Sequence, residues 1–173
     1  GTDQCEKNPD KAIKLNALYP KLLANISNEK GFLLVHFSTN AVFDDSKGGF
    51  YIETDTPRPV NVYGLTKYGG DCFIQAIALK YYILRIAILF GETLKNNQFV
   101  EKMLQKIKDG NKTLNISADI ISSPTYSKDI GRELKRIIES STAYGLYHVA
   151  NEGMISLYGL MQEIIKNLDL DVK

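Results

Sequence analysis

Three residues stand out for the chemistry that their side chains and spacing allow: Thr39, Tyr63 and Lys67. Ser38 and Thr39 end an apolar run, and Tyr63 stands four positions before Lys67. If residues 63–67 are helical, the phenol and the ammonium lie on one face of the helix. An ammonium beside a phenol favours the phenolate. We therefore predict that Lys67 lowers the pKa of Tyr63 from about 10 toward neutrality, where the phenol can exchange protons.

This set suits carbonyl reduction or alcohol oxidation. The Thr39 hydroxyl can hold a carbonyl oxygen against the Tyr63 phenol, which supplies the proton. The hydride comes from a nicotinamide cofactor, because the reaction needs one proton on oxygen and one hydride on carbon. A tyrosine four residues before a lysine is by itself a weak motif in a chain with 10 tyrosines, and it is also typical of a surface helix pair.

Two strands, a loop and a helix are expected to position these groups. Residues 32–37 form an almost continuous apolar run, typical of a strand buried on both faces of a parallel sheet. Ser38 and Thr39 follow at its carboxyl end, where open parallel sheets bind ligands. Residues 44–59 are rich in Asp, Gly, Thr and Pro and indicate a surface loop bordering the site. A helix over 63–79 and a buried strand over 82–89 follow.

The segment before the first strand is predicted to be a long helix. Its start signal is Asn8-Pro9-Asp10, and its apolar spacing continues to Ile26. Pro20 should kink or split it. Helix, strand, loop, helix and strand in succession indicate an α/β domain.

Beyond Gly91 the predicted elements become shorter. We expect helices over 99–107, 127–138 and 156–168, the last capped by Ser156, and strands over 113–116 and 145–150. The predicted fold class is therefore α/β. It combines a partial Rossmann-like parallel sheet with helices over residues 1–91 and a smaller α+β lobe over residues 92–173.

Composition favours a small-molecule partner. The 173 residues are 44% hydrophobic and 24% charged, which fits one globular domain with a sizeable core. The net charge is +1, and no charged patch indicates nucleic acid or membrane binding. Cys5 and Cys72 form no Cys-x-x-Cys pair, which argues against a metal site and a disulfide framework. Since no signal-peptide pattern and no apolar stretch of about 20 residues is present, we expect a cytoplasmic protein.

Some residues with chemical potential are assigned structural roles. His36 and His148 lie within apolar runs, and we expect them in core or edge positions. Arg85 interrupts an apolar strand, and a buried guanidinium needs a partner.

A glycine-rich phosphate-binding turn is not found in these 173 residues. A complete dinucleotide-binding domain begins with a strand, a Gly-x-Gly-x-x-Gly turn and a helix whose N-terminus holds the pyrophosphate. The first segment here instead looks like the helix that follows a middle strand. We therefore expect the amino-terminal part of such a sheet to be lacking, either because the sequence is a fragment or because the protein has lost that part.

The motifs agree in order and spacing with one known family over residues 2–168. The matching stretches include Thr2-Asp3-Gln4-Cys5-Glu6, Phe37-Ser38-Thr39-Asn40-Ala41-Val42-Phe43-Asp44, Pro59-x-Asn61-x-Tyr63-Gly64-x-Thr66-Lys67, Asn97-x-Phe99-Val100, Ser123-Pro124-Thr125-Tyr126 and Gly145-x-Tyr147-His148. The chain thus resembles the extended short-chain dehydrogenase/reductases, and most closely the dTDP-4-dehydrorhamnose reductase family.

The resemblance implies reduction of the 4-keto group of a dTDP-4-keto-6-deoxysugar with NADPH or NADH, in dTDP-rhamnose biosynthesis. Thr39 would polarise the carbonyl and Tyr63 would donate the proton, while Lys67 would lower the tyrosine pKa and bind the nicotinamide ribose. Residues 1–91 would be the carboxyl-side part of the dinucleotide-binding domain, and 92–173 would bind the nucleotide-sugar. The resemblance assigns Ser38, Tyr63 and Lys67 to the cofactor site and the following residues to the substrate site: Asn40, Asn97, Phe99 and Pro124.

Two motifs depart from the family's pattern. The usual Ser-Thr-Asp-Tyr-Val-Phe is Ser38-Thr39-Asn40-Ala41-Val42-Phe43 here, without a carboxylate and a phenol beside Thr39. The usual Asp-Gln-x-Gly-Ser-Pro-Thr is Asp119-Ile120-Ile121-Ser122-Ser123-Pro124-Thr125. Two alternatives stay open: a non-catalytic regulatory or NDP-sugar-binding relative, and an NDP-sugar epimerase or dehydratase on the same scaffold. A homodimer and a complex with a partner subunit are both left open.

Overall fold

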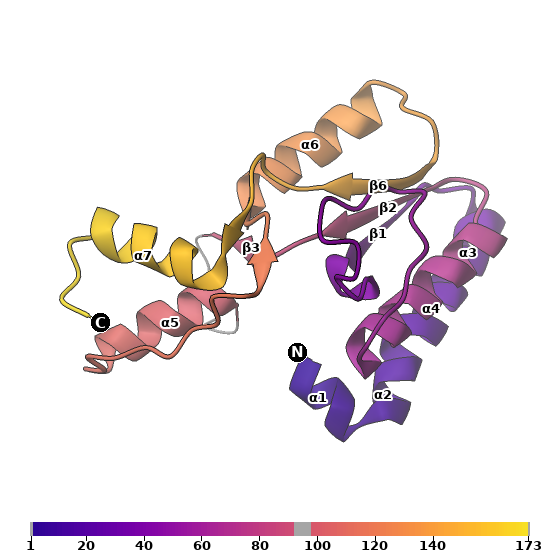
Figure 1. The fold of residues 1–173 in the computed structure, drawn as a ribbon. Coiled ribbons are helices and arrows are strands. Elements are labelled where there is room, and N and C mark those ends of the chain that lie inside the picture. Colours follow the sequence, from indigo (N-terminus) through magenta and orange to yellow (C-terminus); the bar gives the residue numbers. More distant parts are fainter. Residues whose placement is uncertain (1, 92–97, 173) are drawn as a thin grey trace. The chain divides into compact units, whose positions relative to one another are not determined.

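The computed structural model describes residues 2–91 and 98–172, which form two compact units (Figure 1). The first unit comprises Gly1–Ile86 and Ser141–Val149, and the second comprises Ala87–Ser140 and Ala150–Lys173. Within the described residues, every helix is too short or too polar to cross a membrane.

A three-stranded parallel sheet forms the centre of the first unit. Its order is β1 (Leu34–Thr39), β2 (Tyr81–Ile86) and β6 (Gly145–Val149). Leu34 lies opposite Tyr81 and Thr39 opposite Ile86, so that β1 and β2 end side by side. The central strand β2 contains the fully buried residues Ile83 and Leu84. This parallel sheet with its helices confirms the predicted α/β fold class.

Helices α3 (Tyr19–Lys30) and α4 (Val62–Ile77) contact each other, and both pack on the sheet. The core cluster between them contains Ala24, Ile74 and Ile83, each with no exposed surface. Burying an isoleucine side chain contributes about 1.5–3 kcal/mol, so this cluster anchors α4 to the sheet. The face of α4 that carries its polar residues is thereby held at the carboxyl end of β1.

The predicted long helix is disturbed before Pro20. Helices α1 (Thr2–Lys7) and α2 (Pro9–Ile13) are followed by a π-helical turn, η1 (Lys14–Leu18), and then by α3. Pro20 lies in the first turn of α3, and because helical backbone angles continue from η1 into α3, its missing N–H removes one donor from a continuous helix. The predicted disturbance of the helix near Pro20 takes the form of a π-helical turn just before it, and the helix continues through that turn rather than splitting.

Gly70 allows α4 to approach this π-helical turn closely. A Cβ at Gly70 would lie 2.3 Å from the Asn16 carbonyl oxygen. We expect Gly70→Ala to lower the free energy of unfolding by about 1–3 kcal/mol, because the overlap outweighs the gain of about 1 kcal/mol in helix propensity. Urea denaturation would measure this change. Gly131→Ala is the control, since a Cβ there meets no atom within 4 Å, and equal stabilities of the two variants would contradict the prediction.

The second unit consists of short elements. Strand β3 (Leu89–Phe90) pairs in parallel with β5 (Thr125–Tyr126), and β4 (Ile121–Ser122) pairs antiparallel with β7 (Ile155–Ser156). The helices are α5 (Phe99–Lys108), α6 (Ser127–Glu139) and α7 (Leu157–Asn167). Ser156 caps α7 as predicted, because its Oγ accepts a hydrogen bond from the Gly159 amide at 3.0 Å.

Two sequence predictions differ from this architecture. The predicted strand over 113–116 is wrong, since that segment forms neither helix nor strand. Its apolar residues are only Leu114 and Ile116, which alternate with polar neighbours. Within the described part of the chain, no strand pairs with this segment. The predicted strand over 145–150 is β6, which pairs with β2 rather than with the lobe over 92–173. The observed first unit therefore ends at Ile86 and resumes at Ser141, whereas our division used one boundary at residue 91.

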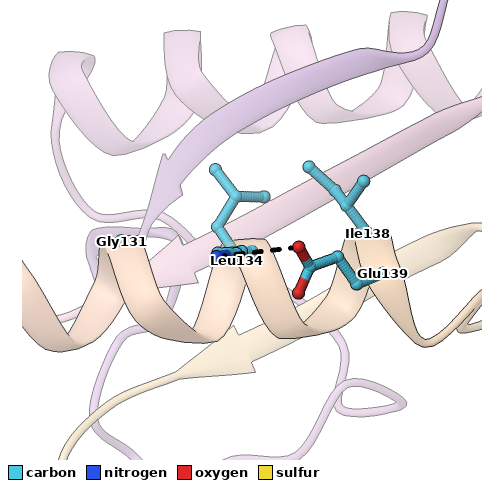
Figure 2. Close-up of a pocket in the computed structure, with 5 residues that line it drawn as sticks. Gly131, Leu134, Ile138 and Glu139 are labelled. Atoms are coloured by element: carbon cyan, nitrogen blue, oxygen red, sulfur yellow. Dashed lines mark ion pairs between the residues drawn. The ribbon is translucent and has the colours of Figure 1, made fainter.

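Helix α6 carries a shallow hollow on its surface (Figure 2). Apolar side chains of Leu134 and Ile138 line it, together with Gly131 and the ion pair between Lys135 and Glu139, whose charged atoms lie 3.7 Å apart. Its two ionisable side chains, Lys135 and Glu139, pair with each other in solvent, and no hydroxyl, thiol or imidazole joins them in the lining. The candidate active site therefore lies elsewhere.

Candidate active site

Thr39 and Tyr63 meet at the carboxyl end of β1. Thr39 is the last residue of the strand and caps the 3₁₀ turn η2 (Asn40–Val42), because its Oγ1 accepts a hydrogen bond from the Ala41 amide at 3.1 Å. The Thr39 side chain also lies beside the Tyr63 phenol, near enough to lower the pKa of that phenol. Since Oγ1 already accepts from Ala41, its own proton is available to the phenol oxygen. The predicted pair is thus in contact.

The start of α4 fixes the position of Tyr63. Asn61 caps the helix, with its Oδ1 accepting from the Gly64 amide at 2.7 Å, and Glu6 accepts from the Val62 amide at 2.7 Å. Such a cap contributes about 1 kcal/mol. A Cβ at Gly64 would lie 2.1 Å from the Ala41 carbonyl oxygen, so only glycine lets the first turn of α4 pack on η2. This close packing brings Tyr63 to Thr39.

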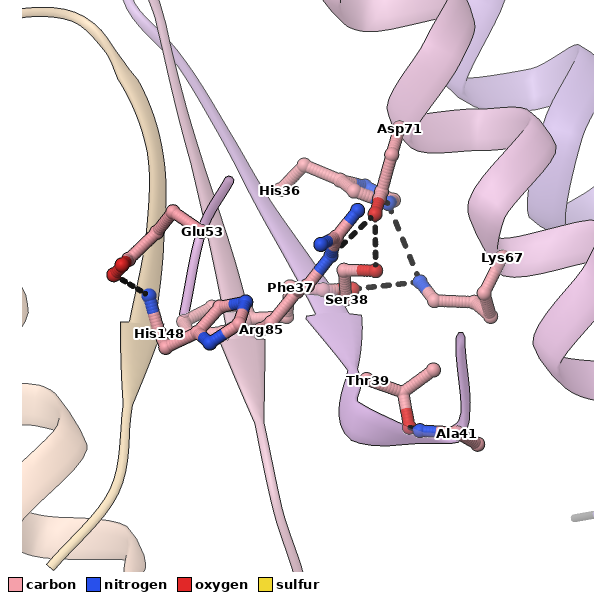
Figure 3. A network of polar contacts seen from close by, with 10 residues as sticks. All are labelled: His36, Phe37, Ser38, Thr39, Ala41, Glu53, Lys67, Asp71, Arg85 and His148. Carbon is pink, nitrogen blue, oxygen red and sulfur yellow. Dashed lines mark hydrogen bonds and ion pairs between the residues drawn. The ribbon is translucent and has the colours of Figure 1, made fainter. Parts of the chain in front are cut away.

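Burial raises the pKa of Tyr63 above its ordinary value, while the Thr39 hydroxyl opposes that rise. The direction is opposite to the one that we predicted. Burial is the main reason, and Lys67 does not offset it: its Nζ donates to the Phe37 carbonyl at 2.6 Å and lies 3.3 Å from Nε2 of His36 (Figure 3). Tyr63 is therefore a protonated phenol near neutral pH, which is the form that donates a proton.

Asp71 is the functional candidate that the sequence reasoning missed. It has no exposed surface, and its Oδ2 accepts from Ser38 Oγ at 2.9 Å and from Arg85 Nε at 3.1 Å. Arg85 therefore has the partner that we predicted it would need. Two signals point to Asp71 in hindsight: it stands four residues after Lys67, on the same helix face, and a buried Arg85 requires a carboxylate nearby.

Burial lowers the pKa of Lys67, and the negative charge of Asp71 opposes this effect. Burial also raises the pKa of Asp71, against the hydrogen bond from Ser38 and the charge of Arg85. The Ser38 hydroxyl, predicted to face the cofactor, points to Asp71 and is buried. The Asp71 carboxylate thus interacts with two cations, Lys67 and Arg85, next to the predicted site.

His36 lowers the stability of the protein in mild acid. Burial, assisted by the Lys67 charge, lowers its pKa from 6.5 to about 3. Below pH 6.5 the unfolded chain gains a proton that the folded chain does not bind, so stability falls as the pH falls toward 3. From pH 7 to pH 5 we expect a loss of about 2 kcal/mol in the free energy of unfolding, seen by urea denaturation. His36→Gln should flatten this slope, and an unchanged slope would contradict the assignment.

The residues predicted to bind substrate are divided between the two units. Asn40 is exposed and directly follows Thr39, in the first unit. Phe99 begins α5 and Pro124 lies between β4 and β5, and both belong to the second unit and are partly buried. Asn97 lies outside the described residues. The first unit therefore brings together Thr39, Tyr63 and Lys67, with Asn40 beside them.

The loop over 44–59 is tied to the sheet of the first unit. Phe43 stacks on Tyr51 with ring centroids 4.2 Å apart, and Glu53 accepts a hydrogen bond from the His148 amide of β6 at 2.8 Å. His148 Nδ1 lies 3.1 Å from the Tyr51 carbonyl oxygen. His148 therefore holds this loop from the edge strand β6, which is one of the positions predicted for it.

Comparison with known proteins gives matches along the whole chain. The family model described as RmlD substrate binding domain matches residues 1–173. A dTDP-4-dehydrorhamnose reductase of Aggregatibacter actinomycetemcomitans is 34% identical over 182 residues, with 97% of this chain and 61% of that protein covered. The spore coat polysaccharide biosynthesis protein SpsK of Bacillus subtilis is also 34% identical, with 98% and 58% covered.

Solved structures agree with this match. The crystal structure of a dTDP-4-dehydrorhamnose reductase from Bacillus anthracis, in complex with NADP, has a TM-score of 0.92 and 34% identity, covering 99% of this chain and 60% of that one. A UDP-N-acetylglucosamine 4-epimerase from Methanobrevibacter ruminantium M1 has a TM-score of 0.87 at 17% identity and shares the fold. The chain thus spans about three fifths of the length of the relatives that it matches. Because the family model covers every residue, the chain belongs to the dTDP-4-dehydrorhamnose reductase family, through its RmlD substrate binding domain.

Proposed function

We propose that these residues carry the catalytic groups of an NADPH-dependent reductase acting on the 4-keto group of a dTDP-4-keto-6-deoxysugar, in dTDP-rhamnose biosynthesis. The observation that carries the proposal is the Thr39 hydroxyl beside the Tyr63 phenol at the carboxyl end of β1, with Lys67 one helical turn further along α4. The similarity to the Bacillus anthracis reductase, whose structure contains NADP, supports it.

The donors present fit the nicotinamide end of such a cofactor. The Tyr63 phenol and the Lys67 ammonium stand four residues apart on α4, and both can donate to ribose hydroxyls. Ser38, which the resemblance also assigns to the cofactor, donates its hydroxyl to Asp71, so we propose that it supports these groups from β1 rather than contacting the cofactor through that hydroxyl. The 173 residues contain no Gly-x-Gly-x-x-Gly turn, so no residue here is assigned to the pyrophosphate.

The bound cofactor would supply a hydride to C4 of the sugar. Thr39 would hold the C4 oxygen against Tyr63, and Tyr63 would transfer its phenolic proton to that oxygen, so that the carbonyl becomes a hydroxyl. The raised pKa of Tyr63 keeps this proton in place until the oxygen gains negative charge. The phenolate that remains would be stabilised by the Thr39 hydroxyl and by the positive charge of Lys67.

The substrate-binding residues are proposed from both units. Asn40, beside Thr39, would contact the sugar, while Phe99 and Pro124 in the second unit, together with Asn97, would contact the nucleotide-sugar.

We infer a cytoplasmic location, because Cys5 and Cys72 are both free thiols. A homodimer and a complex with a partner subunit are distinguished by light scattering of the purified protein.

A product assay tests the proposal. The protein expressed from its complete reading frame is incubated with dTDP-4-dehydro-6-deoxy-L-mannose and either NADPH or NADH. We expect equimolar loss of nicotinamide absorbance and keto-sugar, with a 4-hydroxyl product identified by NMR. An epimerised or dehydrated product without net cofactor consumption would instead support the epimerase or dehydratase alternative. Binding of the sugar nucleotide without turnover would support a non-catalytic role.

A further inference from the structure

Asp71 stands at the centre of a buried network between β1, β2 and α4 (Figure 3). Its Oδ2 accepts hydrogen bonds from Ser38 on β1 and Arg85 on β2. Its other oxygen, Oδ1, is buried without a hydrogen-bond partner and lies 3.7 Å from Nε2 of His36. A fully buried carboxylate with one unsatisfied oxygen is costly, and such groups call for an explanation beyond packing.

His36 connects this carboxylate to Lys67. Its Nε2 lies 3.3 Å from Lys67 Nζ, closer than to Asp71 Oδ1. Burial lowers the pKa of His36 to about 3, so the ring is neutral near pH 7. A neutral imidazole has one donor and one acceptor nitrogen, and Nε2 must be the acceptor while Lys67 carries its proton. The ring then holds the ammonium on one side, as the Phe37 carbonyl does at 2.6 Å.

Titratable groups on α4, β1 and β2 surround Lys67. Asp71 is the anion on α4, Arg85 is the cation on β2, and His36 on β1 is neutral. Tyr63 on α4 is a neutral phenol. Asp71 is therefore the group that opposes the loss of the Lys67 proton on burial.

We propose that Asp71 and His36 are positioning residues, which keep the Lys67 ammonium charged and directed toward the carboxyl end of β1. The assignment of Lys67 to the reaction rests on the proposed function, but its charge and direction are properties of the folded chain. Asp71 acts through its charge and His36 through the Nε2 acceptor. When Lys67 loses its proton, the ring can change tautomer and direct Nε2–H toward Asp71 Oδ1.

Titration of Lys67 by NMR, with ¹³C-labelled lysine, tests the role of Asp71 without substrate or cofactor. Lys67→Arg assigns the signal. In Asp71→Asn, whose amide oxygen can still accept from Ser38 or Arg85, we expect the proton affinity of Lys67 to fall about tenfold or more. Asp55→Asn is the matched control, because it removes the carboxylate of an exposed ion pair with Lys47, and it should leave Lys67 unchanged. An unchanged Lys67 titration in folded Asp71→Asn would overturn the proposal.

The tautomer of His36 gives a second measurement on the unmodified protein, which stands even if Asp71→Asn does not fold. ¹⁵N spectra should show Nε2 unprotonated while Lys67 is charged, and a protonated Nε2 in that range would refute the proposal. The pH profile of kcat then links the network to catalysis. In Asp71→Asn, the apparent pKa of this profile should shift in the same direction and by the same amount as the pKa of Lys67. Absence of reductase activity in the wild type, with the Lys67 shift present, would reject the proposed function and leave this inference standing.

Discussion

Replacing Tyr63 by phenylalanine is expected to lower kcat for keto-sugar reduction by about 10²–10⁴-fold. The change removes one oxygen atom, which is the proposed proton donor and the partner of the Thr39 hydroxyl. The ring and its packing on the first turn of α4 remain, so the fold and the KM for the sugar nucleotide should change little. Steady-state rates of the protein from its complete reading frame, with thermal unfolding in parallel, measure both effects.

Tyr68→Phe is the matched control for this variant. Tyr68 lies on the same helix, one position after Lys67, and its hydroxyl faces Cys72 rather than Thr39. Loss of that hydroxyl should leave kcat within about twofold of the wild type, as expected for a group that touches no reacting atom. A Tyr63→Phe enzyme with the turnover of Tyr68→Phe would remove Tyr63 from the mechanism and favour the non-catalytic alternative.

The sequence predicts the part of this site that depends on local patterns. The apolar run over 32–37, followed by Ser38 and Thr39, is a local signal, and β1 and α4 begin and end close to the predicted residues. The pairing of β6 with β2 depends instead on a chain that leaves the first unit and returns to it. Periodicity reports which face of a segment is buried, and it contains no information on which sheet the segment joins.

The pKa of Tyr63 shows the same limit for the chemistry. Spacing places Lys67 on the face of Tyr63, but it does not reveal competing acceptors such as the Phe37 carbonyl. Nor does it report burial, which is the largest influence on the phenol. Spacing therefore predicted that Tyr63 and Lys67 share one face of a helix, and it did not predict the direction of the pKa shift.

Arg85→Met is expected to have the largest effect on stability, a loss of about 3–5 kcal/mol in the free energy of unfolding. Arg85 and Asp71 form an ion pair whose side chains are 3% and 0% exposed, so removing the guanidinium leaves a buried carboxylate without its countercharge. Arg58→Met is the matched control: Arg58 pairs with Asp44 at 3.4 Å, but its side chain is 70% exposed. Such a surface pair contributes at most about 1 kcal/mol.

Two further measurements separate the charge from the packing of Arg85. In Arg85→Met the buried Asp71 carboxyl has a pKa raised above its ordinary value, so the folded state retains a proton that the unfolded state releases as the pH rises. The destabilisation should therefore be smaller at pH 5 than at pH 7. Adding Asp71→Leu should recover most of the loss, because a buried ion pair can be replaced by apolar side chains at little cost. If the double variant is no more stable than Arg85→Met, the arginine acts through its packing over the Phe43 ring, 5.4 Å away, rather than through its charge.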